Sequence, residues 1–271
     1  MDSSGDEVHD PVVSIVIPTL DEGDRIGATL ESLGRLRAGI GVEILLVAGG
    51  SRDETVAIAE RHGARVLSAD RGRGAQLHAG ARAAKGTVLW FLHADTHPPP
   101  DGLERILEAL EDERVVAGNF GLTFDAGGRA ARFLTWLYPR LRRLGIRYGD
   151  SALFVRREAY LQSGGFRPLP IFEDLDLLRR LRHLGRFASV PSAVITSARN
   201  FQGRSFAPVF ARWTALQMLY WLGVSPHVLG RFYGRARAAP DAKPTVPGIE
   251  GNERGVPAPS STEPDPETET A

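Results

Sequence analysis

Short β-branched runs alternate with amphipathic segments along the first 112 residues. The first run covers residues 12–18, and the segment at 22–37 carries apolar side chains at helical spacing. Further strands are expected at 42–47, 64–67 and 87–92, and further helices at 53–62, 74–85 and 101–111. Parallel strands need crossover connections, and helices usually provide them. The pattern therefore predicts an α/β fold with a mostly parallel sheet flanked by helices.

The alternation becomes less regular after residue 112. Strands are expected at 115–124 and 152–155, and helices at 128–144, 173–184 and 205–222. From about Ala238 the chain is rich in proline, serine, threonine and acidic residues, and such a segment buries too little apolar surface to offset its ordering entropy. We expect one domain at residues 12–235, between a flexible N-terminus at 1–11 and a disordered tail at 236–271.

Composition limits the partners and the compartment. Lysine plus arginine and aspartate plus glutamate each number 33, so no global field recruits nucleic acid. The absence of cysteine excludes disulfides and thiolate metal sites. The acidic start lacks the features of a secretory signal, and no apolar run reaches the roughly 18 residues of a membrane span. We expect a cytoplasmic protein that binds no nucleic acid.

Polar side chains follow each of the first four predicted strands. Ligands of an open parallel sheet bind outside the carboxyl ends of its strands, so these side chains should converge on one rim. In chain order they are Thr19, Asp21 and Glu22; Gly49, Gly50, Ser51 and Asp53; Asp70, Arg71, Gly72, Arg73 and Gly74; and His93, Asp95, Thr96 and His97.

Two of these clusters also have an ordinary structural explanation. Ser51 or Asp53 could simply cap the helix that follows. Residues 71–74 could be a solvated glycine-rich turn, or a loop whose N–H groups and guanidinium ions approach a phosphate. The residues alone leave both alternatives open.

The segment after the fourth strand favours metal binding. Asp95 directly follows a buried run, and His93 and His97 flank it. Oxygen and imidazole ligands suit Mg²⁺ or Mn²⁺ bound together with a diphosphate. A helix cap is a poor alternative, because the next helix begins only near Asp101.

An acidic pair opens the helix expected at residue 173. Glu173 and Asp174 could act only on the helix dipole. However, the preceding segment 164–170 is rich in glycine and proline and would aim the pair at a fixed place. A carboxylate held there could act as general base toward an acceptor hydroxyl.

Taken together, these motifs resemble those of family 2 glycosyltransferases, from about residue 13 to 185 and more weakly to 233. The likeness is carried by SIVIPTLDE at 14–22, VAGGSRDET at 47–55, RGRGAQLHAG at 71–80, FLHADT at 91–96 and the pair Glu173-Asp174. The family resemblance implies the GT-A fold, with a Rossmann-like sheet and, here, C-terminal helices. The chain is most similar to a bacterial subgroup with His-Ala-Asp-Thr, Tyr-Gly-Asp and Thr-Ser-Ala-Arg stretches, here at 93–96, 148–150 and 196–199. Some members of that subgroup carry names tied to carotenoid glycosylation.

The resemblance also implies a reaction and a role for each motif. The reaction would be metal-dependent, inverting transfer of a sugar from a nucleotide-diphosphate sugar to an acceptor hydroxyl. Asp174 would be the base beside Glu173, and Asp95 with His97 would hold Mg²⁺ or Mn²⁺. The residues implied in nucleotide-sugar binding are Pro18, Thr19, Glu22, Gly49, Ser51, Arg71, Arg73, Gln76, His93 and Ala94. The chain departs from the family pattern at Ala48 and His93, where relatives usually have aspartate.

Two aromatic segments bear on the acceptor. Residues 130–147 combine aromatic side chains with five arginines, and residues 206–222 add Trp213, Tyr220 and Trp221. Such segments often lie at membrane interfaces, although ordinary packing against the sheet explains them slightly better. If they lie on the inner face of the cell membrane, the acceptor would be a lipid or a carotenoid-type alcohol.

Two other functions fit parts of the pattern. A nucleotidyltransferase also presents phosphate loops and a metal aspartate at strand ends, but would release pyrophosphate. A non-catalytic nucleotide-sugar binder is suggested by Ala48, whereas the presence of both Asp95 and Asp174 speaks against it.

Overall fold

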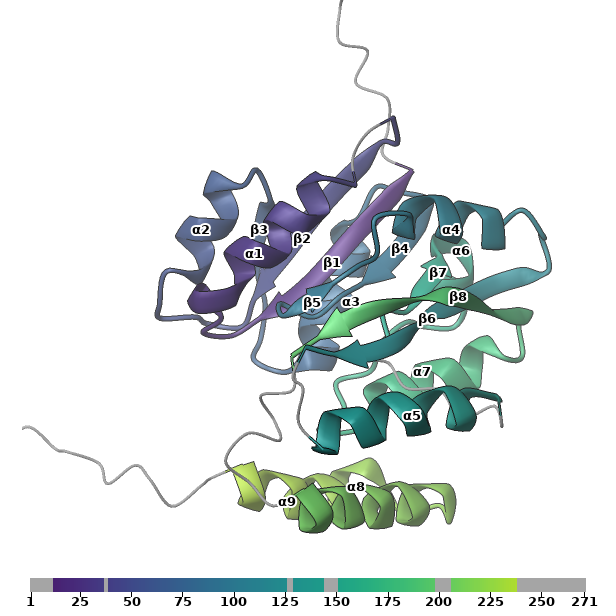
Figure 1. Ribbon diagram of the computed structural model, residues 1–271. Helices are drawn as coiled ribbons and strands as arrows, with labels where there is room; N and C mark the ends of the chain where they lie inside the picture. The colour runs from purple at the N-terminus through teal and green to yellow at the C-terminus, as the bar shows by residue number, and fades with distance from the viewer. Residues whose placement is uncertain (1–11, 37–38, 126–128, 144–150, 198–205, 238–271) are drawn as a thin grey trace, which may run out of the picture.

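The sheet is mixed, and its strands do not follow chain order. The computed structural model describes residues 12–36, 39–125, 129–143, 151–197 and 206–237. Within them the strands are arranged in the order β3-β2-β1-β4-β7-β6-β8-β5 (Figure 1). Their bounds are β1 Val13–Thr19, β2 Val42–Ala48, β3 Arg65–Ser68, β4 Val88–Phe91, β5 Thr96–His97, β6 Val115–Phe124, β7 Phe154–Arg156 and β8 Arg186–Thr196.

The N-terminal half of the sheet is parallel. β1 pairs in parallel with β2 and β4, and β2 pairs in parallel with β3. The helices α1 (Gly23–Gly34), α2 (Thr55–Arg61) and α3 (Arg73–Ala83) provide the connections. β7 then enters antiparallel between β4 and β6, and β8 lies parallel to β6. The predicted α/β fold with a mostly parallel, flanked sheet is confirmed.

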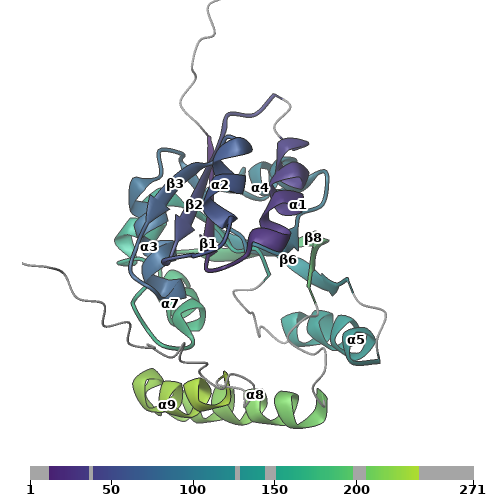
Figure 2. The same cartoon turned by 90° about the vertical axis from the view of Figure 1, so that its left-hand side faces the viewer.

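Side chains of the central strands alternate between two cores. On β1, Val13, Ile15 and Ile17 belong to one buried cluster and Val16 belongs to the other. The first cluster includes residues of α1, α2 and α4 (Gly102–Ala109), and the second those of α3, α6 (Arg157–Gln162) and α7 (Glu173–Leu181). Helices therefore cover both faces of the sheet (Figure 2).

Helix α3 packs closely against the sheet at Gly80. A Cβ atom on Gly80 would lie 2.8 Å from Val47 Cγ2 and still closer to Val16 Cγ1. Only glycine fits there without a shift of β-branched side chains that are themselves buried. This contact fixes α3, and with it the loop that begins the helix, against the ends of β1 and β2.

The C-terminal helices form a further layer beside α7. α5 (Arg129–Arg143) contacts β6, while α8 (Phe206–Trp221) and α9 (Pro226–Arg237) lie farther from the sheet (Figures 1 and 2). Leu216 and Leu229 of this hairpin pack in one cluster with Ile171 and Phe172. Within the described ranges, no helix has both the length and the apolar character that a bilayer crossing requires.

The periodicity did not predict β5, β8, α6 or α9. In β8, Pro191 speaks against a strand. The structure accommodates it at an irregularity, because Ser189 pairs with Asn119 and Ala193 with Gly121. The strand expected at 152–155 begins only at Phe154.

The expected domain boundaries remain a prediction. Helix α9 continues to Arg237, past the boundary expected at residue 235. Residues 1–11 and 238–271, expected to be flexible and disordered, lie outside the described residues. The Tyr-Gly-Asp stretch at 148–150 lies outside them as well.

Candidate functional site

The loops after β1 and β2 are bonded to each other. The N–H of Asp21 donates to Ser51 Oγ at 3.2 Å, and the N–H of Arg52 donates to Asp21 Oδ1 at 2.7 Å. The N–H of Glu22 donates to Thr55 Oγ1 at 2.8 Å. Asp21 has a φ of 53°, a conformation that costs free energy in a non-glycine residue and persists where the surroundings impose it. Two residues expected to bind nucleotide, Glu22 and Ser51, thus belong to one rigid unit.

Asp53 binds the starts of two helices in the same unit. Its Oδ2 accepts from the N–H of Gly23 at 2.8 Å, and its Oδ1 accepts from the N–H of Thr55 at 3.0 Å and from the Thr55 hydroxyl. These bonds, the one from the Thr55 hydroxyl first, hold the pKa of Asp53 below its ordinary value of 3.8. Of the two expected caps, Asp53 therefore contacts helix starts, while Ser51 bonds the other loop.

The variant Asp53→Asn is expected to be about 1 kcal/mol less stable than wild type at pH 7, because one helix-start N–H then faces an amide. The native pKa is depressed, so this stability is fully present above the unfolded pKa and is lost as pH falls through the native pKa. Urea unfolding at neutral and acidic pH checks this. Glu54→Gln, which removes the same charge from the neighbouring residue, serves as the control. A difference that stays constant down to about pH 2 contradicts the assignment.

Gln76 joins α3 to the ends of two strands. Its Nε2 donates to the carbonyls of Thr19 and Val47, both at 2.8 Å, and its side chain is buried. A Cβ on Gly49 would lie 3.0 Å from the Gln76 carboxamide, so a larger residue there would have to displace this side chain. Because both hydrogens of the amide are used inside the protein, the geometry favours a positioning role. The expected contact of Gln76 with ribose or diphosphate stays a prediction.

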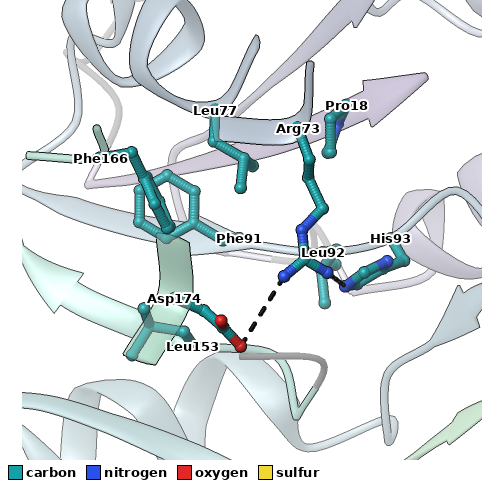
Figure 3. Close-up of a pocket in the computed structure, with 9 residues that line it drawn as sticks. All are labelled: Pro18, Arg73, Leu77, Phe91, Leu92, His93, Leu153, Phe166 and Asp174. Carbon is teal, nitrogen blue, oxygen red and sulfur yellow. Dashed lines mark hydrogen bonds and ion pairs between the residues drawn. The ribbon is translucent and has the colours of Figure 1, made fainter. Parts of the chain in front are cut away.

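Arg73 connects three segments that the sequence singled out separately. Its Nε donates to Glu173 Oε1 in a close contact, and its Nη2 lies 3.7 Å from Asp174 Oδ2. Its Nη1 lies 3.2 Å from His93 Nε2 (Figure 3). Since every guanidinium nitrogen carries hydrogen, His93 Nε2 is the acceptor in this contact. One cation thus holds a histidine and two carboxylates together.

The pocket around this cation is mostly apolar. It is lined by Pro18, Arg73, Leu77, Phe91, Leu92, His93, Leu153, Phe166 and Asp174 (Figure 3). The rings of Phe91 and Phe166 meet edge to face, with centroids 5.0 Å apart. A guanidinium beside such a pocket suits a phosphate.

The acidic pair follows a residue in a left-handed conformation. Phe172 has a φ of 63° and directly precedes Glu173 and Asp174. Its ring packs against Tyr220 at 5.0 Å and Trp213 at 6.4 Å between centroids. The α8–α9 hairpin therefore fixes the residue from which the acidic pair begins.

Arg180 holds the glycine turn onto helix α7. Its Nη2 donates to the Gly165 carbonyl and to Asp176 Oδ2, both at 2.7 Å, and its Nη1 donates to the Ser163 carbonyl. Gly164 and Gly165 have φ values of 80° and 65°, which favour glycine. These contacts connect the glycine-rich segment before the acidic pair to α7, on which the pair lies.

Tyr160 supports this turn from the core. Its hydroxyl oxygen accepts from the N–H of Phe166 at 3.0 Å and lies 3.0 Å from His78 Nδ1. Burial raises the pKa of Tyr160 to about 12. Burial, and next the charge of Arg82, lowers the pKa of His78. The tyrosine hydroxyl is thus protonated at neutral pH and shares one hydrogen bond with the imidazole.

The His-Ala-Asp-Thr segment leads from β4 to β5. Thr29 Oγ1 donates to the Ala94 carbonyl at 2.7 Å. Thr96 pairs with Thr196 across β5 and β8, and their hydroxyl oxygens lie 3.1 Å apart. Segment 93–96 therefore lies beside the beginning of the Thr-Ser-Ala-Arg stretch, whose last two residues lie outside the described residues.

Asp95 can supply one carboxylate to a divalent ion. In the part of the chain that the structure describes, no three His, Asp or Glu side chains form a metal-binding group. An ion at Asp95 and His97 must therefore take further ligands from a diphosphate and water, which is how Mg²⁺ commonly binds beside phosphates. The donor set fits an ion that arrives with its nucleotide.

The structure brings only part of the expected site into the pocket. Pro18, Arg73, His93 and Asp174 line it, and Glu173 contacts Arg73. Expected residues that are not among its lining residues are Thr19, Glu22, Gly49, Ser51, Arg71, Gln76, Ala94, Asp95 and His97. The sequence patterns did not indicate a role for Tyr160 and His78. These two side chains contact each other from separate helices, and such a contact leaves no pattern in the local sequence.

Comparison with known proteins agrees with this geometry. The domain described as Glycosyl transferase family 2 matches residues 14–162. A glucosyl-3-phosphoglycerate synthase of Mycolicibacterium paratuberculosis is 32% identical over 32% of this chain and 29% of its own length. An undecaprenyl-phosphate 4-deoxy-4-formamido-L-arabinose transferase of Edwardsiella ictaluri is 31% identical over 49% of this chain and 41% of its own length. The chain thus spans less than half of either relative.

A solved structure shows the same architecture. Glucosyl-3-phosphoglycerate synthase from Mycobacterium tuberculosis, in complex with Mn²⁺, UDP and glucosyl-3-phosphoglycerate, superposes with a TM-score of 0.57. The match covers 78% of this chain and 79% of that one, at 23% identity. Such a likeness shows the fold, and the expected GT-A architecture is confirmed.

Proposed function

This chain belongs to glycosyl transferase family 2, and from that membership we propose that it moves a sugar from a nucleotide-diphosphate sugar to an acceptor hydroxyl, with inversion at the anomeric carbon. The observation that carries the proposal is the contact of Arg73 with both His93 and Asp174 in one pocket. A cation suited to a diphosphate lies there next to a carboxylate suited to accept a proton.

Asp174 is the proposed base. The acceptor oxygen attacks the anomeric carbon, its proton passes to the Asp174 carboxylate, and the bond from that carbon to the diphosphate breaks. Arg73 lies within reach of Asp174, so an incoming diphosphate competes with this carboxylate for the guanidinium. Donor binding would thereby leave Asp174 available to the acceptor, while Glu173 keeps Arg73 in place.

The remaining donor contacts are proposed from the rigid loops. Glu22 and Ser51 would lie near the nucleoside, and Arg71 near the diphosphate. Asp95 and His97 would hold Mg²⁺ or Mn²⁺, which when bound neutralises the leaving diphosphate. Ala48 ends β2 where family members usually have a base-contacting aspartate, so base recognition would rely on other groups.

The proposed acceptor is a hydroxyl on a lipid or a carotenoid-type alcohol, as expected if the aromatic segments contact a membrane. Support for a lipid, though not for its hydroxyl, comes from the relative whose name specifies undecaprenyl phosphate. The hairpin that contacts Phe172 contributes many aromatic side chains beside the acidic pair.

A thermal-shift screen with UDP-, GDP- and dTDP-sugars, each with and without Mn²⁺, tests the proposal. We expect one donor to raise the melting temperature in a metal-dependent way, and Asp95→Ala to abolish the effect, because a ligand that binds only the folded state stabilises it. No response from folded protein to any donor contradicts it. Binding without turnover in a broad acceptor screen indicates a non-catalytic binder instead.

A further inference from the structure

The outer face of the C-terminal hairpin exposes large apolar side chains. Trp221, Leu222 and Phe232 are 56%, 81% and 61% exposed, and Met218 and Val228 are exposed as well. Met218 and Trp221 of α8 and Leu222 directly after it are exposed and share one side, whereas Leu216, Gln217 and Tyr220 are more buried. Several large exposed apolar side chains on one short hairpin are typical of an interaction site.

The charge of the same helices is one-sided. Helix α5 contains five arginines, α8 one and α9 three, and none of the three contains an aspartate or glutamate. The whole chain, in contrast, has 33 acidic residues against 33 basic ones. Arg132, Arg140, Arg212 and Arg231 are exposed, and helices with this charge complement an anionic partner.

The three helices are joined by aromatic contacts. Phe133 of α5 meets Phe210 of α8 edge to face at 5.8 Å, and the Arg140 guanidinium lies 3.9 Å from the centre of the exposed Trp136 ring. Arginine next to an exposed aromatic ring is suited to the level where lipid headgroups meet acyl chains. Figure 1 shows α8 and α9 on the outside of the molecule, beyond α7 and the sheet.

We propose that the exposed face of α8 and α9, with the adjoining end of α5, docks on an anionic lipid bilayer without crossing it. Apolar insertion of Met218, Trp221, Leu222, Val228 and Phe232 and the attraction of the arginines act together. The inner side of the hairpin packs on Phe172, directly before Glu173 and Asp174. Docking therefore brings the pocket close to the headgroups, where a lipid-borne hydroxyl is available.

Vesicle flotation of the full chain tests the docking, and it does not depend on the proposed function because no transfer is measured. We expect the protein to float with phosphatidylcholine vesicles that contain about a third phosphatidylglycerol. With vesicles of phosphatidylcholine alone, most of the protein should remain in the bottom fraction. Raising the salt from about 0.1 M to about 0.5 M should weaken flotation several-fold.

Matched variants locate the contact. The double variant Trp221→Ser, Leu222→Ser should lower the partition coefficient at least about tenfold, because both side chains leave the acyl boundary. Leu161→Ser removes a 37% exposed leucine from α6 and should change nothing. Wild-type protein that does not float at low salt overturns the proposal. Light scattering that shows a dimer, with flotation equal in wild type and double variant, assigns the face to a second copy instead.

Discussion

Replacement of Asp174 by asparagine is expected to reduce sugar transfer by about 10²- to 10⁴-fold while the fold and donor binding survive. Asparagine keeps the shape of the side chain but cannot take the proton from an acceptor hydroxyl. Because Asp174 lies 3.7 Å from Arg73, the change also removes one negative partner of the guanidinium. Donor affinity should therefore stay equal or rise. Steady-state transfer and the donor-induced thermal shift, measured on the same protein, separate the two effects.

Glu158→Gln is the matched control for this variant. Glu158 is also an acidic residue in the first turn of a helix, α6, and it is exposed. Its loss should leave both readouts unchanged. A transfer rate near that of wild type in Asp174→Asn would remove Asp174 as the base.

The second large effect is expected from Arg73→Gln, which should weaken donor binding about 10- to 100-fold and destabilise the fold by about 1–3 kcal/mol. The stability loss arises because the Glu173 side chain, only 6% exposed, loses the cation that its carboxylate contacts. The Arg73 side chain is 35% exposed, so water compensates in part for the lost ion pair. The loss of stability is therefore smaller than for a fully buried pair.

A double variant separates folding from binding at this position. Adding Glu173→Gln to Arg73→Gln should restore most of the stability, because no buried carboxylate is left without a partner. Donor binding should remain weak, since the cation is still absent. Arg82→Gln, which removes an exposed arginine from the last turn of the same helix, should change neither quantity. Full recovery of donor affinity in the double variant would show that Arg73 acts on the structure alone.

The N-terminal half of the fold follows from local pattern. β1 to β4 and the helices between them are consecutive, and each buries a face that its own periodicity marks. The C-terminal half depends on pairings between distant segments, such as β4 with β7 and β5 with β8. Pro191 prevented the prediction of β8. The sheet accommodates this proline at an irregularity in the pairing of β8 with β6, and that pairing cannot be read from the sequence around Pro191.

The candidate site, too, could be predicted only in part from the sequence. The types and approximate places of Arg73, His93 and Asp174 could be predicted, since each follows a recognisable strand or turn. Their convergence on one guanidinium could not, because Arg73 and Glu173 are 100 residues apart in the chain. The left-handed Phe172 also has no signal in the sequence, because its conformation depends on rings supplied by α8.

The late insertion of β7 beside β4 has a consequence for biosynthesis. Ribosomes deliver the N-terminal part of a chain first, and consecutive strand–helix units can assemble as they emerge. The loops that carry Glu22 and Ser51 are bonded to each other, and both lie in the first 55 residues, so these bonds can form in a nascent chain. The contact of Arg73 with Glu173 can form only after residue 173 has been synthesised, and the contact of Phe172 with Tyr220 only after α8 has been. The two loops proposed for the nucleoside are therefore ready first, whereas the diphosphate cation and the acidic pair are complete only when the chain is nearly finished.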